Sequence, residues 1–264
     1  MVDEEVGLEF VLTRRRVLSA AGLLALAGAM PAFAQATPVP VPAEPLNIVM
    51  VGDSLGEGVW SSLYWRFHAT REVKVINAAK ASTGFNRTPY EDSLVLASGQ
   101  AAHLAVVMTG ANDAQNAWPL QEGGAIGVFG TPTWAPLYRK RMDRFFDAAK
   151  ARGTTVIWIG MPVMREPSFE RRMAVVREAQ REACQARGVT YLDLVPPSVD
   201  ETGAYTHIKK DDKGRIRAFR GDDGVHLTIY GSEWVAEIVL FTLLEDKPAW
   251  MDAARERLIR AALG

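Results

Sequence analysis

Three side chains in this sequence are of the types that nucleophilic catalysis requires. Ser54 stands in Gly-Asp-Ser, directly after the apolar run Leu46–Val51, while Asp223 and His226 stand in Asp-Gly-Val-His. The three-residue spacing lets the carboxylate hold one imidazole nitrogen in a tight turn, while the other nitrogen accepts a proton from a serine hydroxyl. Serine needs such a base because its hydroxyl is a poor nucleophile at neutral pH.

The same residues also have ordinary structural interpretations. Ser54 could cap a helix, and Asp223 could cap the helix that follows it, which would leave His226 as a surface side chain. Taken alone, the Asp-Gly-Val-His segment favours this second interpretation. The remaining motifs and their order along the chain are therefore needed to decide between the two.

Two further segments could stabilise a developing negative charge. Asn112 lies in Thr-Gly-Ala-Asn-Asp, directly after the apolar run Leu104–Met108, where a side-chain amide could donate to an oxyanion. Gly84 lies in Lys-Ala-Ser-Thr-Gly, where the lack of a side chain lets a backbone amide approach a substrate. Read alone, the Asn112 segment is better explained as a common turn.

Strand and helix patterns alternate along the chain after residue 45. Short apolar runs typical of buried strands are followed by segments with helical spacing, which predicts a parallel sheet covered by helices on both faces. We therefore expect an α/β fold, a three-layer α/β/α sandwich with a flavodoxin-like five-stranded parallel sheet. The predicted strands cover residues 46–51, 73–76, 104–108, 154–159 and 189–192. The predicted helices cover residues 58–70, 137–152, 169–187, 229–244 and 250–263.

The order of these motifs resembles that of the SGNH hydrolase superfamily, also called the GDSL family. The sequence also looks similar to an exported bacterial branch of that superfamily, labelled as a domain of unknown function, in VVMTGANDAQ, VIWIGMPVMR and DGVHLT. The resemblance implies that Ser54 is the nucleophile, His226 the base and Asp223 the group that orients it. It also implies an oxyanion hole formed by Asn112, Gly84 and the amide of Ser54.

One segment departs from the family pattern. Many SGNH enzymes carry Asn-x-Gly-x-Ser-Gly in the second block, whereas here Asn77-Ala78-Ala79-Lys80 comes first and the glycine follows only at Gly84. The second oxyanion amide could therefore belong to Ser82 or Thr83 instead.

Two long irregular segments, residues 114–136 and 196–223, follow predicted strands and should emerge at the same end of the sheet as Ser54. They contain Trp118, Trp134 and Arg220, which we interpret as candidate substrate-binding residues. The tryptophans could stack on sugar rings or pack the loops onto the sheet. Arg220 could bind an anionic group or form a surface salt bridge.

The N-terminal residues read as an export signal. Residues 13–18, Thr-Arg-Arg-Arg-Val-Leu, form a twin-arginine pattern, an apolar run follows, and Ala32-Phe33-Ala34 suits a signal peptidase. We expect a signal peptide over residues 1–34 with cleavage near Ala34, a Pro-rich linker over 35–45 and one hydrolase domain over 46–264. The protein is thus expected to be periplasmic or secreted.

Composition narrows the classes of partner. Removing residues 1–34 takes away three of 30 basic and four of 31 acidic residues, which leaves 27 of each. A neutral protein of this kind has no broad electrostatic footprint for nucleic acid. We found no metal-ligand or cofactor motif, so neither a metal nor a cofactor is expected. Cys184, the only cysteine, excludes an internal disulfide.

Three functions follow from these residues. The first is an exported serine esterase that hydrolyses ester-linked short acyl groups, on a small molecule or on cell-envelope glycans. The second is a periplasmic O-acyltransferase that passes the acyl group from the same serine to a polysaccharide, beside a membrane acyltransferase partner. The third is a non-catalytic envelope binding or assembly factor. The acyl length, the acceptor and the oligomeric state stay open at this stage.

Overall fold

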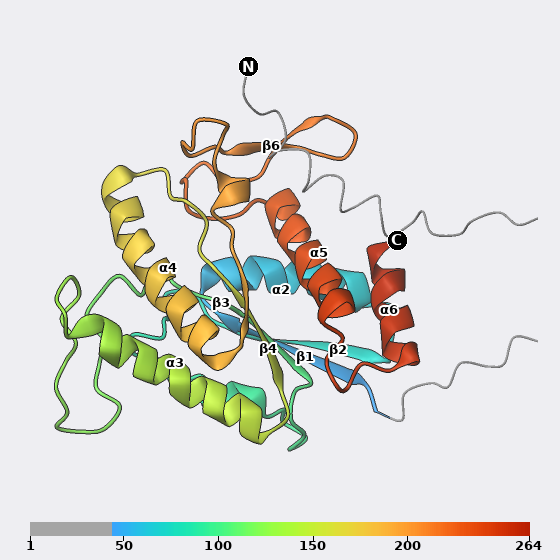
Figure 1. Ribbon diagram of the computed structural model, residues 1–264. Helices are drawn as coiled ribbons and strands as arrows, with labels where there is room; N and C mark the ends of the chain where they lie inside the picture. The colour runs from blue at the N-terminus through green and yellow to red at the C-terminus, as the bar shows by residue number, and fades with distance from the viewer. Residues whose placement is uncertain (1–43) are drawn as a thin grey trace, which may run out of the picture. The chain divides into compact units, whose positions relative to one another are not determined.

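The computed structural model of the chain describes residues 44–264 (Figure 1). The expected export signal and the linker up to residue 43 lie outside the described residues. Within residues 44–264, the structure contains no helix with the length and apolar character needed to span a membrane.

The centre of the fold is a parallel sheet of five strands in the order β2-β1-β3-β4-β5. This strand order is the flavodoxin-like arrangement, which confirms the expected fold class. Every residue of β1 and β3 is buried, because helices cover both faces of the sheet. The strands are β1 (Leu46–Gly52), β2 (Val73–Ala79), β3 (Leu104–Met108), β4 (Thr155–Ile159) and β5 (Thr190–Leu192).

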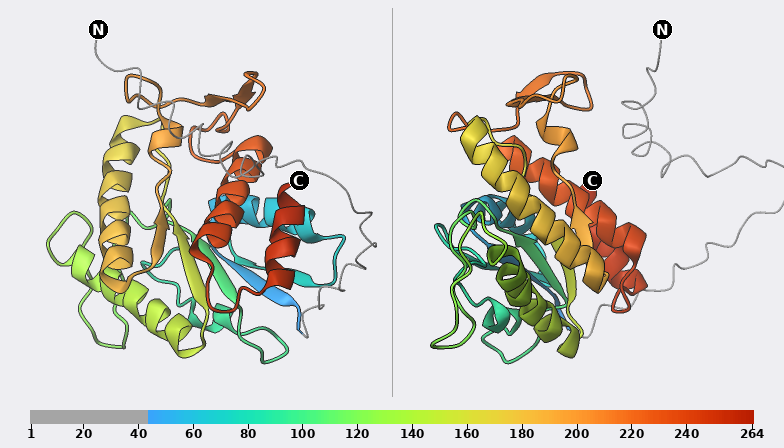
Figure 2. Two further views of the ribbon diagram at one scale, coloured as in Figure 1. Left: turned by 45° about the vertical axis from the view of Figure 1, so that its right-hand side comes forward. Right: turned by 60° about the vertical axis from the view of Figure 1, so that its left-hand side comes forward.

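The helices form two groups, which lie on opposite faces of the sheet because parallel crossovers are right-handed (Figure 2). Helix α2 contacts α5 and α6, whereas α3 contacts α4 and the short 3₁₀ helix η1. The α-helices are α2 (Ser54–Phe67), α3 (Trp134–Ala151), α4 (Pro167–Arg187), α5 (Ile229–Asp246) and α6 (Ala253–Leu263). The 3₁₀ helices are η1 (Glu91–Leu94) and η2 (Pro196–Ser198).

Helix α2 begins at Ser54, four residues before the predicted start at residue 58. Two glycines in its first turns, Gly56 and Gly58, hide the helical pattern in the sequence. Gly56 allows close packing, since a Cβ there would lie 3.0 Å from the carbonyl oxygen of Met108, at the end of β3. The helix therefore starts close against the sheet, with the hydroxyl-bearing residue at its first position.

The junction between β1 and α2 also depends on a glycine. Gly52 has φ +152°, and a Cβ there would stand 1.9 Å from the carbonyl oxygen of Met108. The amide of Asp53 donates to that same carbonyl oxygen at 3.2 Å. The end of β1 thus lies tightly beside the end of β3, so the segments that follow the two strands leave the sheet together.

The irregular segment predicted over residues 196–223 contains a small antiparallel hairpin, β6 (Ile208–Lys210) and β7 (Ile216–Ala218). The sequence pattern did not reveal it because its strands are only three residues long and mostly exposed. The chain returns from this hairpin through Phe219 and Arg220 to the turn that carries His226.

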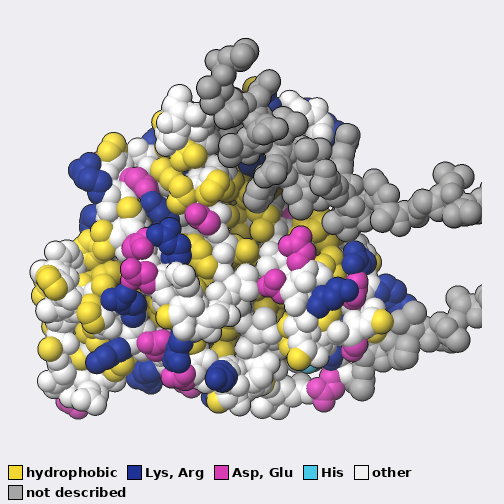
Figure 3. Space-filling view, in the orientation of Figure 1, with side chains coloured by type: hydrophobic (Ala, Val, Ile, Leu, Met, Phe, Trp, Pro, Cys, Tyr) yellow, Lys and Arg dark blue, Asp and Glu magenta, His cyan; other side chains and the backbone are white. Residues whose placement is uncertain are grey.

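Helices α3 and α4 are joined on their outer surfaces by ion pairs. Arg187 of α4 bonds to Asp143 and Asp147 of α3, each at 2.6 Å, and Arg139 of α3 pairs with Glu182 of α4. On the face shown in Figure 3, basic and acidic side chains are interspersed, without a large area of one sign. Such pairs position helices but stabilise an exposed surface only slightly.

Candidate active site

Ser54 and His226, far apart in the sequence, meet at the carboxyl end of β1. The Ser54 Oγ lies 2.8 Å from His226 Nε2, within hydrogen-bonding distance. Ser54 is held there by the start of α2, and His226 by a turn just before α5. A neutral imidazole in this position can accept the serine proton through Nε2.

The other imidazole nitrogen faces Asp223. Nδ1 of His226 lies 2.5 Å from Asp223 Oδ2, and Asp223 Oδ1 accepts from the backbone amides of Val225 and His226 at 2.8 and 3.0 Å. Partial burial raises the pKa of Asp223, but the hydrogen bonds from the imidazole and these amides outweigh it and lower the pKa to about 2. The carboxylate therefore stays ionised at neutral pH and holds the proton on Nδ1.

The turn that carries both residues is closed by its own backbone. The amide of Gly221 donates to the carbonyl oxygen of His226 at 2.8 Å, and the amide of Gly224 donates to Gly221 at 3.0 Å. Gly224 has φ +72°, a conformation that favours glycine, and a Cβ there would also strike the side chain of Arg165. The Asp-Gly-Val-His spacing thus encodes a specific turn and not merely a helix cap.

The segments of Asn112 and Gly84 lie side by side. The Asn112 side-chain amide donates to the carbonyl oxygen of Thr83 at 3.1 Å, and the Asn86 side-chain amide donates to the carbonyl oxygen of Asn112 at 3.3 Å. The Thr83 hydroxyl in turn donates to Gly52 at 3.2 Å, just before Ser54. These bonds place both predicted oxyanion segments at the end of β1.

Sequence analysis missed a buried carboxylate that joins the nucleophile segment to the Asn112 segment. Asp53 is fully buried, and its carboxylate accepts from the amides of Leu55, Gly110 and Ala111 at 3.0 to 3.2 Å. Burial raises the pKa of Asp53 to about 6, although these hydrogen bonds act to lower it. The sequence shows that Asp53 precedes Ser54, but it does not show that the carboxylate of Asp53 also binds the amides of Gly110 and Ala111.

A second missed carboxylate, Asp113, lies behind Gly84. It accepts from the amide of Asn86 at 2.9 Å and from the Tyr138 hydroxyl at 2.8 Å, and a Cβ on Gly84 would stand 2.2 Å from its Oδ1. Burial raises the pKa of Asp113 to about 7. The glycine is therefore required by close packing against Asp113, whether or not its amide also faces a substrate. The Gln180 side chain completes the network by donating to Tyr138.

Two of the three predicted substrate-binding residues are buried. Trp134 is 1% exposed, stacks on Tyr138 at a ring separation of 4.6 Å and donates its indole N–H to the carbonyl oxygen of Gln115 at 2.8 Å. Arg220 is also 1% exposed, and its guanidinium bonds to backbone carbonyls. The prediction that these two side chains bind substrate was wrong, because both are buried and their N–H groups bond to backbone carbonyl oxygens of the protein itself.

Trp118 remains available at the surface. It is 47% exposed, and the guanidinium of Arg87 lies 5.6 Å from its ring centroid. Its backbone is fixed by a hydrogen bond from its amide to the carbonyl oxygen of Asn86 at 2.7 Å. A substrate-binding role for Trp118 stays a prediction.

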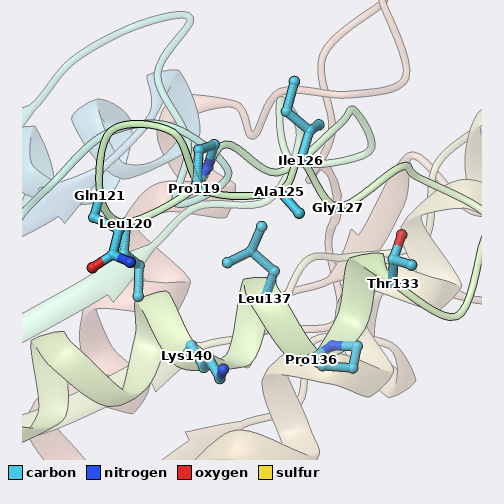
Figure 4. A pocket seen from close by; sticks show the side chains of 11 residues that line it. Pro119, Leu120, Gln121, Ala125, Ile126, Gly127, Thr133, Pro136, Leu137 and Lys140 are labelled. Carbon is cyan, nitrogen blue, oxygen red and sulfur yellow. The ribbon is translucent and has the colours of Figure 1, made fainter.

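A pocket of about 490 Å³ lies beyond Trp118, between the loop after β3 and the first turns of α3 (Figure 4). Its lining is mostly apolar, and Leu137 points into it from α3 while Ile126 lies on the opposite side. None of the residues that line it belongs to the Ser54, His226 and Asp223 group. The catalytic candidates themselves lie at an open surface, with the His226 side chain 47% and the Asp223 side chain 50% exposed.

Within residues 44–264, no group of three or more His, Cys, Asp or Glu side chains is arranged to hold a metal ion. Cys184 is buried in α4, and burial raises the pKa of its thiol well above the usual range, so it is not poised as a nucleophile. The reactive groups that the structure brings together at the end of β1 are the Ser54 hydroxyl, the His226 imidazole and the Asp223 carboxylate.

The fold is that of the SGNH hydrolases, and many solved structures share it. One is a GDSL-like lipase of Bacteroides thetaiotaomicron, which is 14% identical over 76% of this chain and 88% of its own, with a TM-score of 0.50. A second is a proposed acylhydrolase of Bacteroides fragilis, 14% identical over 78% of this chain and 91% of its own, with a TM-score of 0.53. A third is an acetyl xylan esterase, 14% identical over 75% of this chain and 99% of its own, with a TM-score of 0.51.

Within that fold, the chain belongs to the family described as "Protein of unknown function (DUF459)", whose model matches residues 47–242. The matched region runs from β1 into α5 and includes all three residues of the Ser54, His226 and Asp223 group. No curated protein matches the sequence.

Proposed function

We propose that the protein is a serine esterase in which Ser54 is the nucleophile, His226 the general base and Asp223 the residue that orients the imidazole. The observation that carries this proposal is the continuous chain of hydrogen bonds from Asp223 through His226 to the Ser54 hydroxyl. The SGNH fold supports this proposal, because these hydrogen-bonded side chains lie at the carboxyl end of the sheet, where ligands bind in open α/β folds.

The reaction would proceed through an acyl-enzyme. Ser54 Oγ attacks the ester carbonyl while His226 Nε2 takes its proton, and the carbonyl oxygen becomes an oxyanion. Collapse of this intermediate breaks the bond to the alcohol, which leaves with the proton from His226. Water then attacks the acyl group on Ser54, with His226 again accepting and returning a proton, and the carboxylic acid is released.

In this proposal the oxyanion is stabilised by three N–H donors. The Asn112 side-chain amide has two N–H groups, of which one donates to Thr83, so the other can serve the oxyanion. The amides of Ser54 and Gly84 are the further donors in this proposal. One such donor is typically worth about 3 kcal/mol of transition-state stabilisation.

Hydrolysis is the preferred reaction, and acyl transfer to a glycan the second candidate. Roughly half of the His226 and Asp223 side-chain surface is exposed, which favours water as the acceptor because nothing among the described residues excludes it. Transfer requires that an acceptor hydroxyl outcompetes water at the acyl-enzyme. Measuring free acid against acylated glycan, with an acceptor sugar present, would distinguish the two reactions.

The proposed substrates are short acyl groups on cell-envelope glycans. The twin-arginine pattern near the N-terminus supports a location outside the cytoplasm, where such esters occur. The occurrence of the same fold in an acetyl xylan esterase supports acetylated glycans as the first substrates to test.

The test is hydrolysis of p-nitrophenyl acetate by the purified protein. We expect turnover by the wild type and none above background by Ser54→Ala. Ser61→Ala is a matched control, because Ser61 lies on the same helix but away from its catalytic end. Full activity of the Ser54 variant would refute the mechanism.

A further inference from the structure

Arg220 is a buried cation beside the active site. Its side chain is 1% exposed, yet no carboxylate among the described residues forms an ion pair with it. Its guanidinium donates instead to backbone carbonyl oxygens and makes one weak contact with the sulfur of Met164 at 3.5 Å. The ring of Tyr205 lies 5.5 Å from the guanidinium carbon.

The carbonyl oxygens that bind Arg220 come from two separate segments. One nitrogen, Nη1, donates to Val163 at 2.6 Å, in the loop that follows β4. The other, Nη2, donates to Val225 at 2.7 Å and to Gly224 at 3.2 Å, in the turn that precedes His226. Arg220 therefore links this turn to the loop after β4 through hydrogen bonds.

Burying the charged guanidinium of Arg220 carries a desolvation penalty, because the charge is removed from water. Burial lowers the pKa of Arg220 to about 10, so the side chain stays charged at neutral pH despite its desolvation. A planar guanidinium carries donors in a fixed fork, which lets one side chain bond to carbonyls of two segments at once. A lysine would bring only a single nitrogen atom to the same place.

We propose that Arg220 is a positioning residue. Through the carbonyl groups of Val225 and Gly224, it holds the Asp223–His226 turn in the position that directs His226 toward Ser54. The proposal rests on the esterase function proposed above. Arg220 does not touch the substrate. It fixes the two peptide groups immediately before His226, and so the direction in which the imidazole points.

The first experiment compares Arg220→Met and Arg220→Lys with the wild type. Thermal unfolding first establishes that each variant folds, and kcat and KM are then measured with p-nitrophenyl acetate. We expect kcat of Arg220→Met to fall on the order of 100-fold with little change in KM, because a displaced base impairs chemistry more than binding. Arg220→Lys should fall between Arg220→Met and the wild type.

The matched control is Arg66→Met. Arg66 is also largely buried and joins separate elements, bonding to Glu237 of α5 at 2.7 Å and to the carbonyl oxygen of Ala262 of α6 at 2.8 Å. It lies in the last turn of α2, at the far end of that helix from Ser54. We expect this variant to lose stability but to keep the wild-type kcat.

The second readout is the proton NMR signal of the His226 Nδ1–H group. A proton shared with a carboxylate resonates far downfield, and we expect this signal in the wild type and in Arg66→Met but not in Arg220→Met. A folded Arg220→Met or Arg220→Lys variant with wild-type kcat and an unchanged signal would overturn the proposal. If the wild type lacks esterase activity but loses the signal on substitution of Arg220, the esterase function fails while the positioning role stands.

Discussion

At the scale of single residues, the proposed role of the Asp223 carboxylate is to keep the Nδ1 proton of His226 in place, across a distance of 2.5 Å. Replacing Asp223 by Asn should lower kcat by roughly 10³- to 10⁴-fold, because a neutral amide neither fixes the tautomer nor stabilises the imidazolium. Ester hydrolysis under saturating substrate measures this effect.

The neighbouring carboxylate provides the control for that prediction. Asp222 is exposed and precedes Asp223 directly in the same turn. Asp222→Asn should therefore retain wild-type kcat. Equal losses in the two variants would show that the turn, and not the carboxylate at position 223, is what the substitution affects.

The Asn112 side chain is the second residue with a predicted chemical role. Asn112→Ala should lower kcat by about 10²- to 10³-fold while the protein stays folded, because one oxyanion donor is lost. Asn116→Ala in the same loop is the control, since Asn116 only accepts from the amide of Phe129 at 3.0 Å. An Asn112 variant as active as this control would remove Asn112 from the oxyanion hole.

The motifs in the sequence predicted that Ser54 and His226 lie together. They did not reveal that Trp134 and Arg220, predicted to bind substrate, are buried. Motif spacing constrains residues that follow strand ends, because those ends share one edge of the sheet. Whether a loop side chain is buried depends instead on distant partners, such as Gln115 for Trp134 and Val163 for Arg220. No local pattern contains those partners.

At the scale of elements, the buried Asp113 network ties the loops after β2 and β3 to α3. The pKa of Asp113 is about 7 in the folded protein, against 3.8 as its ordinary value. Between these values the folded state binds a proton that the unfolded state has already released, so the free energy of unfolding falls as pH rises from about 4 to about 7.

Asp113→Asn should weaken that dependence. Urea unfolding at several pH values between 4 and 8 measures the free energy of unfolding, and the decline should be smaller in the variant than in the wild type. Some decline should remain, because burial also raises the pKa of Asp53, to about 6. Parallel curves for the two proteins would contradict the raised pKa of the buried Asp113 carboxyl group.

Element positions were predicted best where burial is continuous. The strand over residues 104–108 was predicted with its observed bounds, because a fully buried strand reads as an unbroken apolar run. The start of α2 was placed too late, since its cap at Asp53 and its close packing at Gly56 depend on β3. The hairpin β6–β7 was missed because its strands bury little apolar surface.

At the scale of the whole molecule, the proposed function depends on where the protein works. If the twin-arginine pattern acts as the proposed export signal, replacing Arg14 and Arg15 together by Lys should retain the protein in the cytoplasm. Fractionation of cells that produce the wild type and the variant tests whether this pattern addresses the protein for export. Equal amounts outside the cytoplasm would refute the export route.

The most direct measurement of the central claim is covalent labelling of Ser54 by a fluorophosphonate, located by mass spectrometry of peptides. We expect one adduct, on Ser54 of the wild type, none in Ser54→Ala, and much slower labelling in His226→Ala, because the imidazole 2.8 Å from the hydroxyl takes its proton. An unlabelled, folded wild type, or an adduct on another residue, would contradict the account.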